Sequence, residues 1–312
     1  MSLIEQAAKR LEQLRQAGVE LPEKPVESLV APPVNHAPPR SSVKGNENSA
    51  GELTSVKAPS PKSTEATLNL DAISASGFLV PNAARSQLAD EFRVIKRPLI
   101  ANAMGRSGAP ISNGNLIMVT SALPGEGKSF SAINLAISIA MELDNTVMLV
   151  DADVARPSVL NMLGLPPSKG LLDVLQDNSI DISGVLLRTN IEKLSILPSG
   201  TPHPRATELL ASDAMIRLLD DMASRYSDRI IIFDSPPLLL TTESRVLATH
   251  MGQVVIVVNA ENTLQSAVKE AIATIQLCPV KMMILNQVRT EKIAGYGYGY
   301  GYGYGYGYGH EK

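Results

Sequence analysis

Residues 121–129 read Ser-Ala-Leu-Pro-Gly-Glu-Gly-Lys-Ser and combine two glycines with a lysine and a hydroxyl group. A loop of this kind turns successive backbone N–H groups inward and leads into a helix N-terminus, so it favours a phosphate chain. Lys128 can reach the terminal phosphates, and Ser129 can hold Mg²⁺. Ala122 departs from the pattern, because such loops usually begin with glycine. The residues expected to bind the nucleotide here are Pro124, Gly125, Glu126, Gly127, Lys128, Ser129 and Phe130.

Three carboxylates follow apolar runs elsewhere in the chain. Asp151, with Asp153 two residues later, and Asp234 each come after four consecutive apolar residues. A carboxylate in this position lies at the carboxyl edge of a parallel sheet, which is also the edge that carries a phosphate loop. Ser129, Asp151 and Asp234 are therefore the expected ligands of Mg²⁺.

The elements that must position these residues are visible as short apolar runs separated by longer helix-like stretches. The expected strands are residues 116–120, 146–150, 194–197, 229–233, 253–258 and 282–285. The expected helices include residues 129–143, 206–226 and 263–277. Apolar strands that alternate with helices indicate an α/β fold of the P-loop NTPase type, with a parallel sheet covered by helices on both faces.

The rest of the chain differs in composition from this predicted domain at residues 78–294. Residues 1–18 have apolar side chains at helical spacing and predict an amphipathic helix. Residues 19–77 are rich in proline and contain no aromatic residue, so we expect a disordered tether. Residues 295–312 form a tail that begins with an unbroken Gly-Tyr alternation.

The tail concentrates the tyrosines of the protein. Seven of the eight tyrosines lie there, at Tyr296, Tyr298, Tyr300, Tyr302, Tyr304, Tyr306 and Tyr308. A Gly-rich chain is flexible, so any of several phenols could enter an active site. A sticky low-complexity segment or a strand-forming patch would give the same pattern.

Charge and composition restrict the class of protein. The 312 residues carry 28 Lys and Arg against 31 Asp and Glu, and this balance argues against a nucleic-acid partner. The single cysteine, Cys278, excludes a disulfide framework. No stretch approaches the roughly 20 apolar residues of a membrane helix. We therefore expect a soluble, cytoplasmic protein.

Together, these motifs resemble the bacterial tyrosine kinases of exopolysaccharide and capsule synthesis. Residues 121–129 look like the Walker A loop of that family, residues 151–157 like its second acidic motif, and residues 233–237 like its Walker B motif. The Asp-Ser-Pro-Pro run within residues 233–237 and the tyrosine tail are the most specific parts. The resemblance implies a protein-tyrosine autokinase that uses ATP and Mg²⁺ and phosphorylates its own tail.

The resemblance also implies a division of roles among the site residues. Lys128, Asp151 and Asp153 form the expected catalytic set, with Asp153 as the base. A carboxylate base is useful because a phenol, with a pKa near 10, keeps its proton at neutral pH. Asn286, at the end of the last predicted strand, resembles the residue that contacts the nucleotide base in related ATPases.

Partners follow from the same resemblance. Many relatives carry membrane helices in the same chain. No such helix is expected in this sequence, so it looks like the cytosolic half of a split system. A membrane-bound chain-length-determinant protein would anchor it at the inner membrane and activate it, and a cognate tyrosine phosphatase could reverse the reaction. A homo-oligomer is expected, although the family's oligomerisation motif, Glu-x-x-Arg-x-x-Arg, is degenerate here as Asp90, Arg93 and Lys96.

Two other functions remain open at this stage. A partition or division-site ATPase shares the fold, but it carries a lysine where this chain has Leu123. A non-catalytic, nucleotide-dependent adaptor is the second alternative. It is supported by Ala155, which stands where the kinases commonly have an arginine, with Arg156 one position later.

Overall fold

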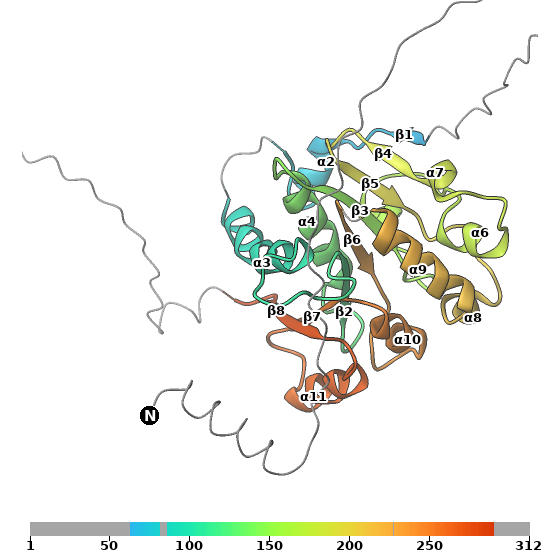
Figure 1. Ribbon diagram of the computed structural model, residues 1–312. Coiled ribbons are helices and arrows are strands. Elements are labelled where there is room, and N and C mark those ends of the chain that lie inside the picture. The colour runs from blue at the N-terminus through green and yellow to red at the C-terminus, as the bar shows by residue number, and fades with distance from the viewer. Residues whose placement is uncertain (1–62, 82–85, 227, 290–312) are drawn as a thin grey trace, which may run out of the picture. The chain divides into compact units, whose positions relative to one another are not determined.

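The computed structural model describes residues 63–81, 86–226 and 228–289, all of which belong to one unit spanning residues 57–312. An eight-stranded sheet runs through these residues in the order β1-β4-β5-β3-β6-β2-β7-β8 (Figure 1). The strands are β1 Thr64–Ala66, β2 Leu116–Ser121, β3 Thr146–Asp151, β4 Leu187–Thr189, β5 Leu194–Leu197, β6 Arg229–Asp234, β7 Gln253–Asn259 and β8 Val280–Asn286. The predicted amphipathic N-terminal helix and tyrosine tail lie outside the described residues.

The six predicted strands are all present, and they are parallel to one another. The sheet departs from this pattern at one side, where β4 pairs antiparallel with β5 and β1 pairs parallel with β4. The fold is therefore the expected α/β type with a mainly parallel sheet.

Alternate residues of each central strand enter different cores. In β2, Leu116 and Met118 belong to one hydrophobic cluster, whereas Ile117 and Val119 belong to the other. Side chains of a strand point alternately to the two faces of its sheet, so a strand covered on both faces must be apolar throughout. This geometry explains the unbroken apolar runs that marked the strands in the sequence.

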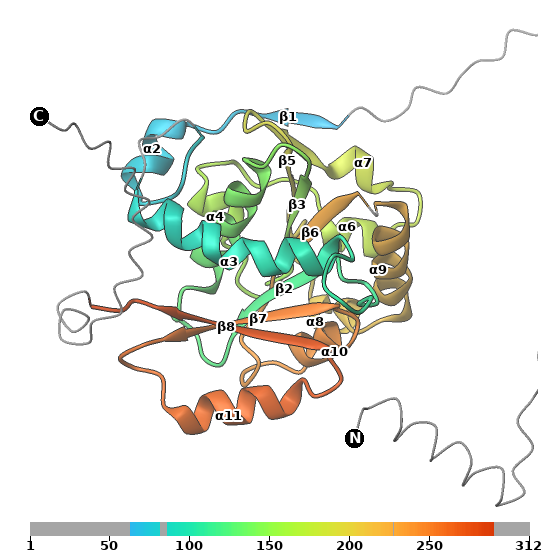
Figure 2. The same cartoon turned by 60° about the vertical axis from the view of Figure 1, so that its left-hand side comes forward.

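Two groups of helices cover the two faces of the sheet (Figure 1). One group comprises α2 Leu70–Ala75, α3 Gln87–Ala103, α4 Lys128–Ala140 and α5 Val159–Met162. The opposite group comprises α6 Leu171–Gln176, α7 Ile182–Val185, α8 Ala206–Leu210, α9 Asp213–Arg225, α10 Glu243–Thr249 and α11 Gln265–Thr274. Figure 2 shows α3 crossing in front of the sheet and α11 beside β7 and β8.

The boundary of the predicted tether was too late in the chain. Strand β1 and helix α2 lie within residues 63–77, and Leu68 and Ile73 are buried in the core beneath α4. Asn190 fixes the segment by accepting a hydrogen bond from the Leu68 N–H and donating one to its carbonyl. Strand pairing, two buried side chains, the Asn190 hydrogen bonds and a local cap at Asn69 hold a stretch whose composition alone predicted disorder.

The helix predicted over residues 206–226 is two helices. Ser212 separates α8 from α9, accepts a hydrogen bond from the Met215 N–H and donates one to the Leu209 carbonyl. A serine N-cap of this kind starts a new helix and changes the direction of the chain.

Candidate functional site

The predicted phosphate loop connects β2 to α4 at the centre of the sheet. Gly125 and Gly127 have φ angles of 82° and 91°, a left-handed conformation that glycine adopts at little cost. A Cβ atom at Gly127 would lie 2.1 Å from the side-chain nitrogen of Asn286. Leu123, Pro124 and Gly125 are exposed, so the loop faces solvent ahead of the helix N-terminus.

Two buried residues of the loop, Glu126 and Ala122, attach it to the rest of the domain. The Glu126 side chain is buried, with 3% of the residue exposed. Its carboxylate accepts a 2.6 Å hydrogen bond from the Leu123 N–H and a second hydrogen bond from the Thr263 hydroxyl. The side chain of Glu126 therefore braces the loop, which leaves its backbone for a phosphate. The methyl group of Ala122 is buried in the core, and this burial accounts for a residue other than glycine at that position.

Phe130 does not present its ring to the loop. The ring packs against that of Phe78, with 5.0 Å between centroids. Its backbone N–H belongs to the first turn of α4, where amides have no partner within the helix. Any contact between Phe130 and a phosphate would therefore use the backbone.

The three predicted carboxylates meet Lys128 at the carboxyl edge of the sheet. The Lys128 ammonium lies 2.7 Å from Asp153 Oδ2 and 3.8 Å from Asp234 Oδ1. Asp151 Oδ2 accepts hydrogen bonds of 3.1 Å from the backbone N–H groups of Ser158 and Val159. The strand-end positions thus bring residues separated by more than 100 positions into one cluster.

Burial of the cluster changes its acid–base properties. Burial, together with the nearby charge of Asp234, raises the pKa of Asp151 to about 7. Burial also raises the pKa of Asp234 to about 6, although the Lys128 ammonium opposes the change. Burial lowers the pKa of Lys128, but the carboxylates of Asp234 and Asp153 outweigh it and leave a net increase. The site therefore carries an excess of negative charge.

The residues present fit a divalent cation. Within the described residues, Asp151 Oδ1 and both carboxylate oxygens of Asp234 are buried without a hydrogen-bond partner. The Ser129 hydroxyl accepts a 3.0 Å hydrogen bond from that of Ser158. The described residues contain no cluster of three or more His, Cys, Asp or Glu side chains that could hold a metal alone. Mg²⁺ is usually bound by one or two carboxylates and completed by substrate phosphates, so this donor set suits it.

Asn286 lies against the phosphate loop from the side of β8. Its side-chain amide donates a 2.9 Å hydrogen bond to the Glu126 carbonyl. The next residue, Gln287, has a φ of 59°, is hydrogen-bonded to Asn259 and reaches the Gly125 carbonyl at 3.4 Å. The predicted base contact of Asn286 remains a proposal, and the residue lies directly against the phosphate loop.

Sequence reasoning missed three residues that support the site: Ser158, Thr263 and Gln287. Ser158 contacts both Ser129 and Asp151, and Thr263 anchors Glu126. Gln287 directly follows β8, so the strand-end rule that selected the acids could have selected it, whereas Thr263 lies beyond Asn259, the last residue of β7, and the rule gives no signal for it. Ser158 gives no such signal, because it lies seven residues after the end of β3, at the N-cap of the short helix α5.

The degenerate oligomerisation motif lies on α3 and divides into two parts. Arg93 forms an ion pair with Asp90, and both side chains are about half exposed. Lys96 is only 5% exposed and donates to the Ser138 carbonyl near the end of α4, with Glu142 at 2.6 Å. Lys96 therefore links two helices of one chain, and Asp90 and Arg93 are the part that faces outward.

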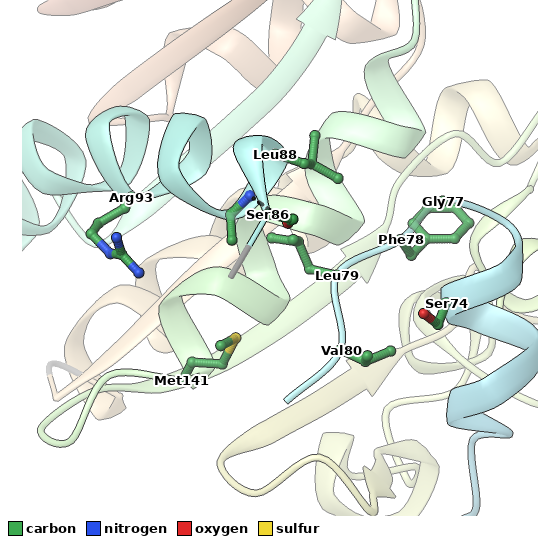
Figure 3. A pocket seen from close by; sticks show the side chains of 10 residues that line it. Ser74, Gly77, Phe78, Leu79, Val80, Ser86, Leu88, Arg93 and Met141 are labelled. Atoms are coloured by element: carbon green, nitrogen blue, oxygen red, sulfur yellow. Dashed lines mark hydrogen bonds between the residues drawn. The ribbon is translucent and has the colours of Figure 1, made fainter. Parts of the chain in front are cut away.

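A separate cavity of about 730 Å³ is lined by residues 74–80, by the start of α3 and by Met141 (Figure 3). Phe78, Leu79 and Leu88 line it together with Arg93. None of the phosphate-loop residues or acids contributes to it. This cavity is therefore separate from the cluster of Lys128 and the acids.

The fold and this site define a P-loop nucleotide-binding domain. The family described as "AAA domain" matches residues 114–287, more than half of the chain. In the described part of the chain, no helix combines the length and apolar character required to cross a bilayer.

Comparison with similar proteins shows which family of P-loop nucleotide-binding proteins the chain resembles. The chain is 33% identical over 182 residues to tyrosine-protein kinase YwqD of Bacillus subtilis, covering 58% of this chain and 75% of that protein. It is 26% identical over 224 residues to the putative tyrosine-protein kinase CapB of Staphylococcus aureus, covering 71% and 93%. The crystal structure of the chimerical protein CapA2B2 matches with a TM-score of 0.55 and 28% identity, covering 72% and 93%. The chain belongs to the bacterial tyrosine kinase family.

Proposed function

We propose that this protein is an ATP-dependent protein-tyrosine autokinase whose acceptors are the tyrosines of its own tail. The observation that carries the proposal is the cluster of Lys128, Asp153, Asp234 and Asp151 at the end of a phosphate loop. Membership of the tyrosine kinase family supports the choice of acceptor, as does the concentration of seven tyrosines directly after the domain.

The residues divide the work of phosphoryl transfer as follows. Backbone amides of the loop and Lys128 bind the phosphates of ATP, and Asn286 lies on the side of the nucleotide base. Asp151, Asp234 and Ser129 would hold Mg²⁺, which neutralises phosphate charge when bound. A carboxylate takes the phenolic proton as the new bond forms. Asp153 is the candidate for this base, and its carboxylate also pairs with the Lys128 ammonium and accepts a hydrogen bond from the Arg156 N–H.

The biological setting follows from the family resemblance. The kinase would regulate polymerisation or export of an exopolysaccharide or capsule from the cytoplasmic side of the inner membrane. A membrane-bound chain-length-determinant protein would anchor and activate it, and a tyrosine phosphatase would reset the tail. Self-association would allow the tail of one copy to reach the site of another.

Phosphorylation of the tail would act as an assembly switch. Each phosphate adds about −1.5 to −2 charges, so seven add roughly −10 to −14. This change is several times the net charge of −3 on the whole chain. Repulsion between modified tails would then loosen an oligomer.

One experiment separates the kinase from its two rivals. The purified full chain is incubated with labelled ATP and Mg²⁺, with and without the cytosolic peptide of a chain-length-determinant protein. Phosphotyrosine on the protein supports the kinase. Free phosphate without phosphotyrosine would instead identify a partition-type ATPase, and nucleotide binding without turnover an adaptor.

A further inference from the structure

A second cavity, of about 270 Å³, adjoins the acidic cluster. Its walls come from the chain after β3 and from the loop after β5, and they include Pro157, Leu160, Pro167 and Pro202. Asp151 also lines it. That carboxyl group is 1% exposed, and its Oδ1 atom has no hydrogen-bond partner among the described residues.

The order of the strands places this cavity on one side of the phosphate loop. Across the sheet the strands lie in the order β5-β3-β6-β2-β7-β8. The phosphate loop follows β2, and the cavity lies at the ends of β3 and β5. Asn286 ends β8, on the opposite side of β2. Lys128 turns toward the β3 side, where it meets Asp153. With the nucleotide base beside Asn286, as proposed above, the terminal phosphate points toward the cavity.

Size and lining indicate what the cavity holds. Pockets for drug-sized ligands measure about 300–1,000 Å³, so 270 Å³ suits one side chain better than a nucleoside. Proline and leucine side chains offer apolar surfaces to an aromatic ring, and the acidic cluster lies beside them at Asp151. These features match a phenol.

We propose that this cavity receives the ring of the acceptor tyrosine. The inference rests on the proposed kinase function and assigns its acceptor site. The glycines on both sides of each tail tyrosine carry no side chain, so the backbone can approach a narrow opening. In the transfer itself, the phenolic oxygen bonds to the γ-phosphorus of ATP and the bond to the β–γ bridging oxygen breaks. ADP leaves with that electron pair, and the phenolic proton passes to a carboxylate of the cluster.

The test fills the cavity without touching the nucleotide site. Asn161 and Ser168 line the cavity from exposed or half-exposed positions, so Asn161→Trp and Ser168→Trp place an indole in it. Asn178→Trp is the matched control, because Asn178 is exposed and does not line the cavity. All variants are made in a full chain whose seven tail tyrosines are serine, and the substrate is the peptide Gly-Tyr-Gly-Tyr-Gly.

Both cavity variants should lose at least about tenfold in kcat/KM for the peptide, whereas the KM for ATP stays within about twofold. The control should behave as the parent. Unchanged peptide phosphorylation in both cavity variants would overturn the assignment. A rise in the KM for ATP as large as the loss in kcat/KM for the peptide would also overturn it, because it would show that the nucleotide occupies the cavity.

A binding measurement distinguishes failure of this inference from failure of the kinase proposal. If the parent binds ATP but phosphorylates no peptide under any condition, the kinase proposal is wrong. Peptide binding is then measured by fluorescence anisotropy with a non-hydrolysable ATP analogue and Mg²⁺. Binding that Asn161→Trp removes and Asn178→Trp keeps would still support a phenol site here. Absence of binding in the parent would overturn it.

Discussion

At the scale of single residues, the site without a ligand buries two carboxyl groups whose charge is not fully compensated. Asp151 and Asp234 are almost fully buried, and several of their oxygens lack partners within the described residues. Lys128 is the cation closest to the cluster, and its ammonium already pairs with Asp153. A nucleotide complexed with a divalent cation would supply the missing positive charge and the missing contacts together.

The raised pKa of Asp151, about 7, predicts a pH-dependent cost of keeping this carboxyl group buried. The folded state holds a proton that the unfolded state releases above about pH 4, so the group lowers the free energy of unfolding as pH rises to about 7. Asp151→Asn removes this cost. In the absence of nucleotide, its stability relative to the parent should therefore increase between pH 5 and pH 8, as measured by urea unfolding.

The matched control is Asp220→Asn on the exposed surface of α9, which makes the same chemical change at a side chain that is not buried. An Asp151→Asn variant whose stability relative to the parent did not change with pH would contradict the buried, uncompensated carboxyl group.

Gly127 provides a second test at this scale. An alanine there meets both an unfavourable left-handed φ and the Asn286 side chain, so we expect Gly127→Ala to weaken ATP binding by at least about tenfold. Gly164→Ala is the control, because Gly164 has a φ of 68° but no atom within 4 Å of its Cβ position. Isothermal titration would measure both. Equal ATP affinity in the two variants would show that the contact between loop and β8 is unimportant.

At the scale of elements, α3 and α4 are joined by Lys96. Its ammonium reaches the Ser138 carbonyl near the end of α4, where the helix dipole favours a cation. Lys96→Met should lower the free energy of unfolding by about 1.5–3 kcal/mol, the range for hydrogen bonds of charged groups, without changing self-association. Urea unfolding and sedimentation would check the two parts. Exposed Lys169→Met is the control, and unchanged stability of Lys96→Met would refute the internal role.

The elements also show what the sequence could predict and where it failed. All six parallel strands were predictable, because burial on two faces requires unbroken apolar runs. The acids and the phosphate loop were predictable for the same reason, since strand ends meet at one edge. Strand β1 and helix α2 were not, because Leu68 and Ile73 stand in a stretch that resembles the tether. The support of Asp151 by the Ser158 and Val159 N–H groups depends on the start of α5, a helix too short to leave a periodic pattern.

At the scale of the whole molecule, the proposed kinase combines a folded nucleotide site with an acceptor tail. Replacing all seven tail tyrosines with phenylalanine should leave ATP affinity unchanged and abolish most autophosphorylation, because the phosphate-loop residues are not altered. After incubation with ATP and Mg²⁺, the parent should dissociate to smaller species in sedimentation, whereas the phenylalanine variant should not, because roughly 10 or more negative charges are missing from its tail. Substantial phosphotyrosine elsewhere in the variant would exclude the tail as principal acceptor.

The central claim is that Lys128 and the strand-end acids act on ATP to modify tyrosine. Lys128→Met in the otherwise unchanged full chain tests it most directly, with phosphotyrosine measured after incubation with ATP, Mg²⁺ and the activator peptide. The account predicts a loss of at least about 100-fold in the rate of autophosphorylation, because Lys128 binds the phosphates undergoing transfer. A variant that modifies itself as fast as the parent would contradict it.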